Sequence, residues 1–299
     1  GSFALDANTT GSDNVAVGRH ALGTSTTGTA NTALGKGALF NNTTASYNTA
    51  VGMEALHANT TATSGTAVGY NALKANTTGA GNDAFGRQAL LNNTTGCVNT
   101  AVGYGALYTN TTGCYNVAMG NDSVTYNTTG SGAVGIGYHA LLRQTTGANN
   151  TAVGYRAGDS VTTGAGNTYI GYLAGDNGST GSNNIAIGQN SVLSAAAVSN
   201  EINLGNSSIN NLRCYDTSIT SPSDERDKTN IVDIPLGLSF INDVRPVSFD
   251  WNQRDGKRIG RKDFGFIAQE LKIAADATDY ADHMRLVHDN NPDLLEADP

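Results

Sequence analysis

The chain has 299 residues, a formal net charge of −8 and only 14% charged residues, and 37 of its residues are glycine. Lys and Arg form no cluster, which excludes an electrostatic groove for nucleic acid. No apolar run is long enough to cross a bilayer, so we expect no membrane insertion. Three cysteines, an odd and small number, do not indicate a disulfide framework.

Residues 1–210 are a repeat with a period of 17 residues. An unbroken fixed period indicates that each unit is one structural turn stacked on the next, as in a solenoid. The period is marked by a glycine that recurs without a slip at Gly18, Gly35, Gly52, Gly69, Gly86, Gly103, Gly120, Gly137, Gly154, Gly171, Gly188 and Gly205.

Each repeat predicts one coil of two short strands joined by two turns. An apolar, β-rich segment precedes each glycine, as in Val15–Val17 and Ile185–Ile187, and Ala-Leu and a polar Asn-Thr-Thr-Gly turn follow it. We expect the Val or Ile and the Ala-Leu residues to stack as inner ladders, with Asn and Thr ladders at the corners. The glycine is expected where the backbone needs positive φ or close approach. Twelve parallel coils predict a mainly β shaft of roughly 55–60 Å.

The sequence Asn-Thr-Ala-Val-Gly at 48–52, 99–103 and 150–154 resembles the head repeats of trimeric autotransporter adhesins. The resemblance implies a left-handed parallel β-roll and a homotrimer. The period of 17 departs from the shorter repeats common in those heads, which leaves the handedness and cross-section open. Similar repeats also occur in phage fibres.

The shaft offers few candidate chemical groups. Cys97 and Cys114 are one period apart, so we expect them on adjacent coils, with a plain cysteine ladder favoured over a disulfide or a metal pair. His20, His57 and His139 have no clustered Cys or carboxylates, so we expect no metal site and no cofactor. The eight acidic residues of residues 1–210 are spread singly, which disfavours the carboxylate pair of a glycan-cutting enzyme.

The composition changes near residue 210, because all five prolines and the only tryptophan, Trp251, follow it. We expect the shaft over 1–210, a linker over 211–222 and a small α/β domain over 223–299. The predicted elements of this domain are a helix over 235–244, a strand over 247–251, a strand over 263–267 and a helix over 268–277. An Asp-Gly turn is predicted at 255–256.

Three sequence blocks in this domain carry a second resemblance. Residues 223–231 have the form S-D-x-R-x-K-x-x-I, residues 235–249 begin with Pro-Leu-Gly-Leu, and residues 264–271 read Phe-Gly-Phe-Ile-Ala-Gln-Glu-Leu. Together they resemble the S74 peptidase family, the C-terminal intramolecular chaperone of phage tailspikes and fibres. The resemblance implies a domain that helps three chains register and fold and then cuts itself off. That family usually ends in a long helix, so we expect the domain here to be C-terminally incomplete.

The family's serine–lysine dyad, carried onto this chain, makes Ser223 the nucleophile and Lys228 the base, with the cut at a bond flanking Ser223. A serine needs a base to take its proton, and a lysine serves only when burial lowers its pKa. An alternative stays open, because Ser221-Pro222-Ser223-Asp224 also reads as the start of a helix. Residues five apart lie about 140° apart around a helix, so the dyad needs a non-helical Ser223 or groups from two chains.

These observations predict a virion tail-fibre protein made in the host cytoplasm. The expected partners are two further copies of the chain and a host cell-surface receptor. The expected enzyme activity is autoproteolysis of the chain itself, in cis. The alternative is a bacterial trimeric surface adhesin without proteolysis.

Overall fold

The computed structural model describes residues 1–212, 238–250, 260, 262–278, 287–288 and 296–297. The chain divides into two compact units, residues 1–214 and residues 215–299. Each unit is described separately below.

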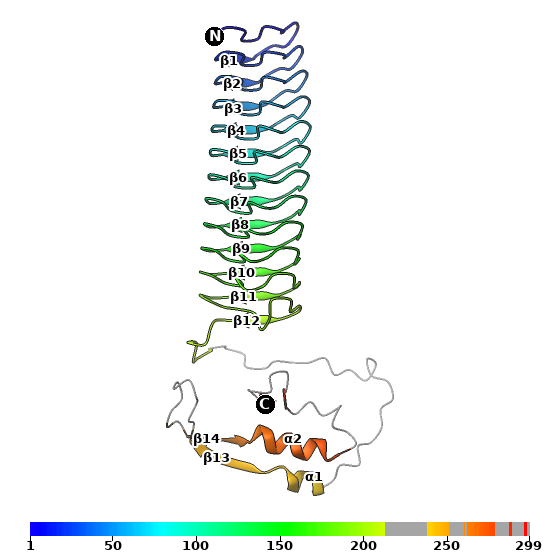
Figure 1. Ribbon diagram of the computed structural model, residues 1–299, viewed down its shortest axis with the longest axis vertical. Coiled ribbons are helices and arrows are strands. Elements are labelled where there is room, and N and C mark those ends of the chain that lie inside the picture. The colour runs from blue at the N-terminus through cyan, green and yellow to red at the C-terminus, as the bar shows by residue number, and fades with distance from the viewer. Residues whose placement is uncertain (213–237, 251–259, 261, 279–286, 289–295, 298–299) are drawn as a thin grey trace. The chain divides into compact units, whose positions relative to one another are not determined.

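The first unit is a parallel β-solenoid whose coils stack along one axis, as Figure 1 shows. Each strand pairs in parallel with the strand 17 residues later, so that Ala33 lies opposite Ala50 and Ala50 opposite Ala67. The predicted solenoid of 17-residue repeats is therefore confirmed. Its strands are β1 (Val15–Val17), β2 (Thr32–Leu34), β3 (Thr49–Val51), β4 (Thr66–Val68), β5 (Asp83–Phe85), β6 (Thr100–Val102), β7 (Val117–Met119), β8 (Val134–Ile136), β9 (Thr151–Val153), β10 (Thr168–Ile170), β11 (Ile185–Ile187) and β12 (Ile202–Leu204).

The prediction of two strands in each coil is wrong, because each coil contains one strand of three residues. The remaining segment bends repeatedly through left-handed backbone positions. In the second coil His20, Leu22 and Ala30 have φ of 57°, 50° and 55°. Such a backbone cannot be an extended strand, yet it still hydrogen-bonds to the next coil, as from the Leu22 N–H to the Ala38 carbonyl at 3.0 Å.

The recurring glycine follows each strand and has the predicted role. Gly18 has φ of 133°, and a Cβ atom there would lie 2.6 Å from the carbonyl carbon of Gly35 in the next coil. Both the backbone angle and the close approach therefore require glycine at this position.

The core of the solenoid consists of the central residue of each strand, which is alanine in nine of the twelve, and the Ala-Leu pair that follows the glycine in most coils. Leu22 and Ala33 are fully buried. The expectation that the strand Val and Ile residues also face inward is wrong, since Val17 is 53% and Ile187 40% exposed. Successive side chains of a strand point to opposite faces, so a three-residue strand with its central residue inside turns its two end residues outward.

Asparagines form two buried ladders inside the coil, where corner ladders were predicted. In the turn asparagine column, which follows the Ala-Leu pair, the side chain of Asn59 donates to Asn42 Oδ1 at 2.9 Å. In the strand asparagine column, which directly precedes nine of the twelve strands, the Asn31 backbone N–H donates to Asn14 Oδ1 at 2.9 Å. These bonds satisfy polar groups that the interior would otherwise leave unpaired.

Threonines form a third ladder at the turn, in which one of two adjacent threonines bonds and the other is exposed. Thr43 Oγ1 donates to the Thr60 carbonyl at 3.1 Å, while its neighbour Thr44 points to solvent. The two adjacent side chains of the turn thus point apart.

The described residues of the second unit form two helices and two antiparallel strand pairs. Its elements are α1 (Leu238–Asp243), β13 (Pro246–Asp250), β14 (Lys262–Phe266), α2 (Ala268–Asp276), β15 (Val287–His288) and β16 (Glu296–Ala297). The pairs are β13 with β14 and β15 with β16, with Val247 opposite Gly265 in the first. The small α/β unit is confirmed, while the predicted turn at 255–256 lies outside the described residues. Within the described part of the chain, no helix is long and apolar enough to span a membrane.

Candidate functional site

The predicted dyad of Ser223 and Lys228 lies outside the residues that the structure describes, as does the bond flanking Ser223. The competing helix start at Ser221-Pro222-Ser223-Asp224 lies in the same segment. The dyad and its alternative therefore both stay predictions. The described elements that follow this segment in the chain are α1, β13, β14 and α2.

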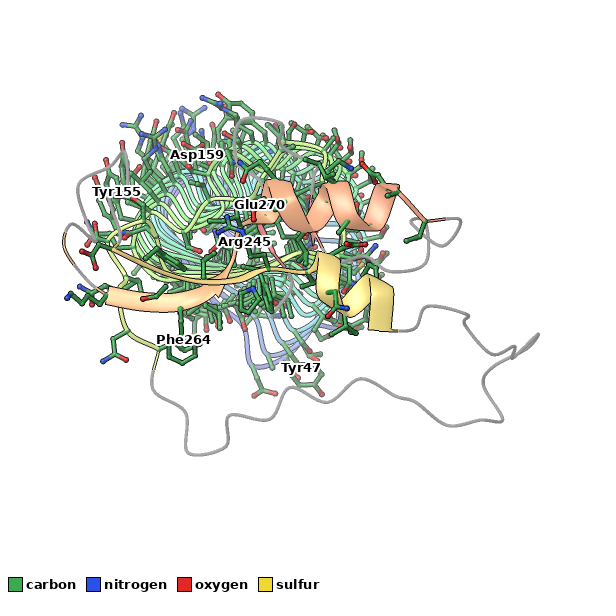
Figure 2. The ribbon with its side chains drawn as sticks, turned by 90° about the horizontal axis from the view of Figure 1, so that it is seen from below. Tyr47, Tyr155, Asp159, Arg245, Phe264 and Glu270 are labelled. Carbon is green, nitrogen blue, oxygen red and sulfur yellow. The ribbon has the colours of Figure 1, made fainter. Side chains whose placement is uncertain are left out.

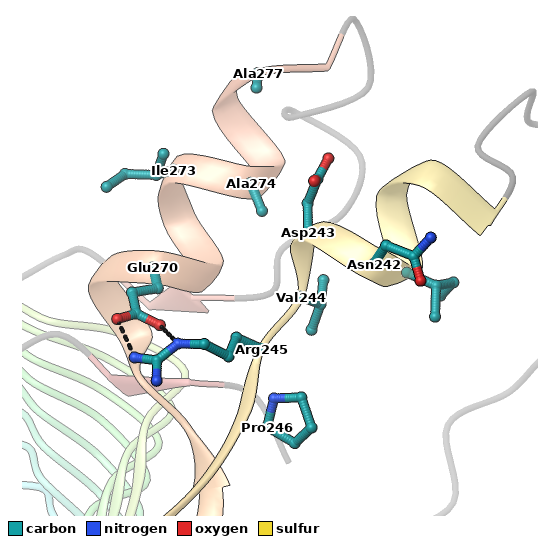
Figure 3. Close-up of a pocket in the computed structure, with 10 residues that line it drawn as sticks. Asn242, Asp243, Val244, Arg245, Pro246, Glu270, Ile273, Ala274 and Ala277 are labelled. Atoms are coloured by element: carbon teal, nitrogen blue, oxygen red, sulfur yellow. Dashed lines mark hydrogen bonds and ion pairs between the residues drawn. The ribbon is translucent and has the colours of Figure 1, made fainter.

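An open groove of about 760 Å³ lies between α1, the start of β13 and α2 (Figure 3). One wall comes from α1 and the connection to β13, and the other from α2. The lining residues are Ile241, Asn242, Asp243, Val244, Arg245, Pro246, Glu270, Ile273, Ala274 and Ala277.

An ion pair between Arg245 and Glu270 closes one end of this groove, as the dashed lines of Figure 3 show. Arg245 Nη2 lies 2.6 Å from Glu270 Oε1, and Arg245 Nε donates to Oε2 at 3.0 Å. The hydrogen-bonded carboxylate raises the pKa of Arg245, and the guanidinium lowers the pKa of Glu270. Both side chains are exposed, so the ion pair contributes little to stability. Its two hydrogen bonds instead fix the start of β13 against the first turn of α2.

The sequence interpretation did not predict this ion pair, although both residues lie inside the quoted blocks. Arg245 precedes Pro246, and Glu270 stands near the end of the block at 264–271. Arg245 and Glu270 are 25 positions apart in the sequence, and no local spacing rule of the kind that identifies ion pairs on one helix applies at that separation.

The described part of the second unit also exposes apolar side chains. Phe264 of β14 is 84% exposed, and Ile273 of α2 is 70% exposed. Phe264 and Phe266 are two residues apart in one strand, so they lie on the same face of the β13–β14 pair. Exposed large apolar groups of this kind are typical of surfaces that another chain or segment covers.

The outer surface of the shaft has an equally clear division. The last residue of every strand is apolar, and we call this set the apolar column. Nine of its twelve members are exposed and the other three are half-buried. The column consists of Val17, Leu34, Val51, Val68, Phe85, Val102, Met119, Ile136, Val153, Ile170, Ile187 and Leu204.

In several coils the residue directly after the recurring glycine is a tyrosine, and these tyrosines widen the apolar surface. Tyr138, Tyr155 and Tyr172 stack on one another, with ring centroids 5.3 and 5.2 Å apart. Figure 2 looks along the shaft and shows the Tyr155 side chain at the surface, well separated around the cross-section from Tyr47. Of the first and last residues of the twelve strands, only Asp83 carries a charge.

Threonines cover a different part of the coil, in the turn between the two asparagine columns. We call the exposed member of each threonine pair the threonine column. Every member is exposed. It consists of Thr10, Thr27, Thr44, Thr61, Thr78, Thr95, Thr112, Thr129, Thr146, Thr163 and Thr180. The shaft therefore has one apolar and one hydroxyl-rich surface strip along its length.

The shaft histidines contact aromatic rings and single carboxylates. His20 stacks on Phe3, His57 on Phe40, and His139 Nε2 lies 4.0 Å from Asp122 Oδ2. Among the described residues, no three His, Cys, Asp or Glu side chains gather into a group that could hold a metal ion.

The comparisons with known proteins bear on the second unit. The search of curated proteins found no match, and the search of solved structures found no match either. Residues 223–280, a segment that includes Ser223, Lys228, the groove and the Arg245–Glu270 pair, match the model of the Peptidase_S74 family, described as chaperone of endosialidase.

Proposed function

We propose that this chain is the tail-fibre protein of a phage-type virion, a trimeric shaft whose C-terminal domain promotes assembly and then cuts its own chain. The observation that carries the proposal is the family match over residues 223–280, directly after a solenoid of twelve strands. A chaperone domain joined to a repetitive shaft fits a protein whose identical coils must be aligned between chains before they pack.

The surface of the shaft supports association of copies. A monomer in water would expose the apolar column and the five tyrosines that directly follow the recurring glycine, which together amount to roughly 700–1,000 Å² of apolar surface. These tyrosines are Tyr70, Tyr104, Tyr138, Tyr155 and Tyr172. Stable interfaces bury about 800 Å² from each partner. Three shafts with their apolar columns at a common axis would cover this surface and leave the threonine columns in water.

The repeat length explains why register needs assistance. A shift of one chain by 17 residues places every coil against an equivalent coil, so the apolar columns alone discriminate weakly between registers. A non-repetitive domain after the shaft, with its own exposed Phe264 and Ile273, supplies a unique point of alignment. This is the physical reason for placing a chaperone at the C-terminal side of the repeats.

The proposed cleavage is an acyl transfer. Ser223 Oγ attacks the carbonyl carbon of a flanking peptide bond, and neutral Lys228 accepts the hydroxyl proton. The carbon–nitrogen bond breaks, the released amine takes a proton from the lysine, and water then hydrolyses the ester. Since a lysine is neutral near pH 7 only when burial lowers its pKa, burial upon assembly would make the cut conditional on correct trimer formation.

The alternative is a bacterial trimeric surface adhesin without proteolysis, which the Asn-Thr-Ala-Val-Gly repeats favour. The two functions differ in what happens at Ser223. A fibre protein with a cis-acting chaperone loses its C-terminal domain after assembly, whereas the adhesin keeps one uncut chain.

The test is the intact mass of the purified protein for the wild type, Ser223→Ala and Lys228→Ala, with Ser218→Ala as a control for loss of a nearby hydroxyl. We expect the wild type and Ser218→Ala to split next to residue 223 and the other two variants to stay whole. A wild type that remains whole as a folded assembly would contradict the proteolytic part of the proposal and favour the adhesin. Cleavage in Ser223→Ala would show that another group makes the cut.

A further inference from the structure

Cys97 and Cys114 occupy equivalent positions in successive coils, three residues before β6 and β7. Most residues at this position are hydroxyl residues, and their side chains make one recurring contact. The side-chain oxygen of one coil accepts a hydrogen bond from the backbone N–H of the equivalent residue in the preceding coil. The donor–acceptor distance is 3.0 Å both for Thr29 with Ser46 and for Ala165 with Ser182.

The two cysteines follow the same rule, with sulfur in place of oxygen. The Cys97 backbone N–H donates to Cys114 Sγ at 3.0 Å, and the Cys114 N–H donates to Ser131 Oγ at 3.0 Å. Both thiols are free and half-buried. The contact holds the sulfur of Cys114 against the coil that carries Cys97.

The thiols also interact with each other. The pKa of Cys97 is raised above its ordinary value, first by the side-chain hydrogen bond with Cys114 and then by burial. The side chain of Cys114 thus acts on that of Cys97, while the Cys114 thiol donates to the Thr112 carbonyl at 3.7 Å.

A single cysteine at this position would only replace a serine. Two cysteines in successive coils place two thiols next to each other in space. Successive coils place equivalent Cα atoms about 4.7–4.9 Å apart, within the range of about 4.4–6.8 Å that disulfides span. We propose that Cys97 and Cys114 are a redox modification site, a dithiol that oxidises to a disulfide joining the coils of β6 and β7. The proposal depends on the described coils alone and not on the function of the C-terminal domain.

The reaction balances with a low-molecular-weight disulfide, such as oxidised glutathione, as the oxidant. One cysteine thiolate attacks a glutathione sulfur, which breaks its disulfide bond and releases one reduced glutathione. The second cysteine thiolate attacks the resulting mixed disulfide, forms the Cys97–Cys114 bond and releases the second reduced glutathione. The protein loses two protons and two electrons, and the glutathione disulfide gains them.

The disulfide would be a covalent cross-link between two coils in the middle of the shaft. It closes a loop of one repeat and joins two coils that are otherwise held by hydrogen bonds and packing. Since each coil contacts chiefly its neighbours, unfolding that starts at either end would stop at the joined pair. Because the thiolate is the reacting form and the pKa of Cys97 is raised, oxidation should be faster at alkaline than at neutral pH.

The test uses the full chain with Cys214→Ser, so that only the two shaft thiols remain. The protein is incubated with oxidised glutathione, and its thiols are counted after unfolding, alongside its intact mass. We expect the thiol count to fall from two to zero, with the mass reduced by two hydrogen atoms and no glutathione attached. Retention of both thiols, stable attachment of glutathione, or a disulfide between chains would overturn the proposal.

A matched control moves one thiol by a single coil. In the Cys114→Ser, Ser131→Cys variant of the same background, Cys97 and the new cysteine lie two coils apart, about 9.5 Å between Cα atoms, beyond disulfide reach. This variant keeps two thiols at equivalent positions and should form no intramolecular disulfide. Equal oxidation of the control would mean that local unfolding, and not stacking, brings the thiols together.

Discussion

The ring of Tyr169 fills the space that a side chain at Gly158 would occupy, since a Cβ atom there would lie 2.7 Å from Tyr169 Cδ2. Tyr169 replaces the small central residue of a strand, and it is fully buried. Gly158 and Gly175 stand where most coils have leucine, one in the coil of Tyr169 and one in the next. One large residue thus compensates for two missing leucine side chains, and burial raises the pKa of its hydroxyl to about 12.

Replacement of Tyr169 tests this compensation. Tyr169→Ala removes the ring and leaves a cavity between two glycines, so it should lower the free energy of unfolding by about 3–5 kcal/mol. Addition of Gly158→Leu and Gly175→Leu to Tyr169→Ala rebuilds the usual coil and should recover most of the loss. Circular dichroism during chemical unfolding measures both. If the two leucines lowered stability further, the packing explanation would be wrong.

A defect in the turn asparagine column offers a stabilising substitution. Asn8 Oδ1 and Ser25 Oγ are buried without a hydrogen-bond partner, because the serine is too short to continue the ladder. Ser25→Asn should donate to Asn8 Oδ1 and accept from Asn42, in the same way that Asn59 donates to Asn42 Oδ1. We expect the free energy of unfolding to rise by about 1–3 kcal/mol, measured by urea titration.

The reverse substitution in an intact part of the ladder is the control. Asn76 donates to Asn59 Oδ1 at 3.2 Å and accepts from Asn93 at 2.8 Å. Asn76→Ser breaks both bonds and should destabilise the shaft by a similar amount. Changes in the free energy of unfolding that are equal in size and opposite in sign would show that the continuous asparagine ladder stabilises the shaft. A Ser25→Asn variant with unchanged stability would contradict this explanation.

His57 predicts an acid-sensitive contribution to stability near the N-terminal end of the shaft. Burial lowers its pKa, the nearby Lys74 lowers it further, and Glu54 raises it. The folded coil therefore favours the neutral imidazole, so its stabilising effect is present above the ordinary pKa of 6.5 and is lost as the pH falls below it. The ring stacks on Phe40, with centroids 5.3 Å apart.

His57→Phe keeps a ring against Phe40 and removes the titrating group. We expect a smaller loss of thermal stability between pH 7.5 and 5.5 in this variant than in the wild type, with similar melting temperatures at pH 7.5. The hydrogen bond with Lys74 lowers the pKa of Glu54. The stability that Glu54 contributes is therefore lost only at a lower pH than the stability that depends on His57. Identical melting curves of the two proteins at pH 5.5 would contradict the assignment to His57.

The sequence predicts the solenoid well because each recurring residue meets its own copy one coil away. A period without insertion, marked by Gly18 and its equivalents, leaves parallel stacking as the one arrangement that repeats every contact. The same regularity predicts that Cys97 and Cys114 are adjacent, which the structure confirms. Local signals also place α1, β13, β14 and α2 within about two residues of their expected bounds where the structure describes them.

What the sequence could not provide was the direction of the strand side chains. Val17 and Ile187 are as apolar as the buried Leu22, so hydrophobicity alone assigned all of them to the core. The backbone decides otherwise, because the left-handed turns at His20, Leu22 and Ala30 leave one strand whose small central residue fits the narrow interior. Non-glycine residues with positive φ are uncommon enough that composition rarely reveals them.

The apolar column gives the most direct test of the proposed assembly. Sedimentation equilibrium of the Ser223→Ala chain, which keeps all parts together, should give three times the chain mass. In this background, Val102→Lys with Ile136→Lys places charges in the column and should weaken association at least about 100-fold, since a buried unpaired lysine costs several kcal/mol. Thr95→Lys with Thr129→Lys places the same charges in the threonine column and should leave the trimer intact. A monomeric Ser223→Ala chain, or two lysine pairs with the same effect, would contradict a trimer built on the apolar column.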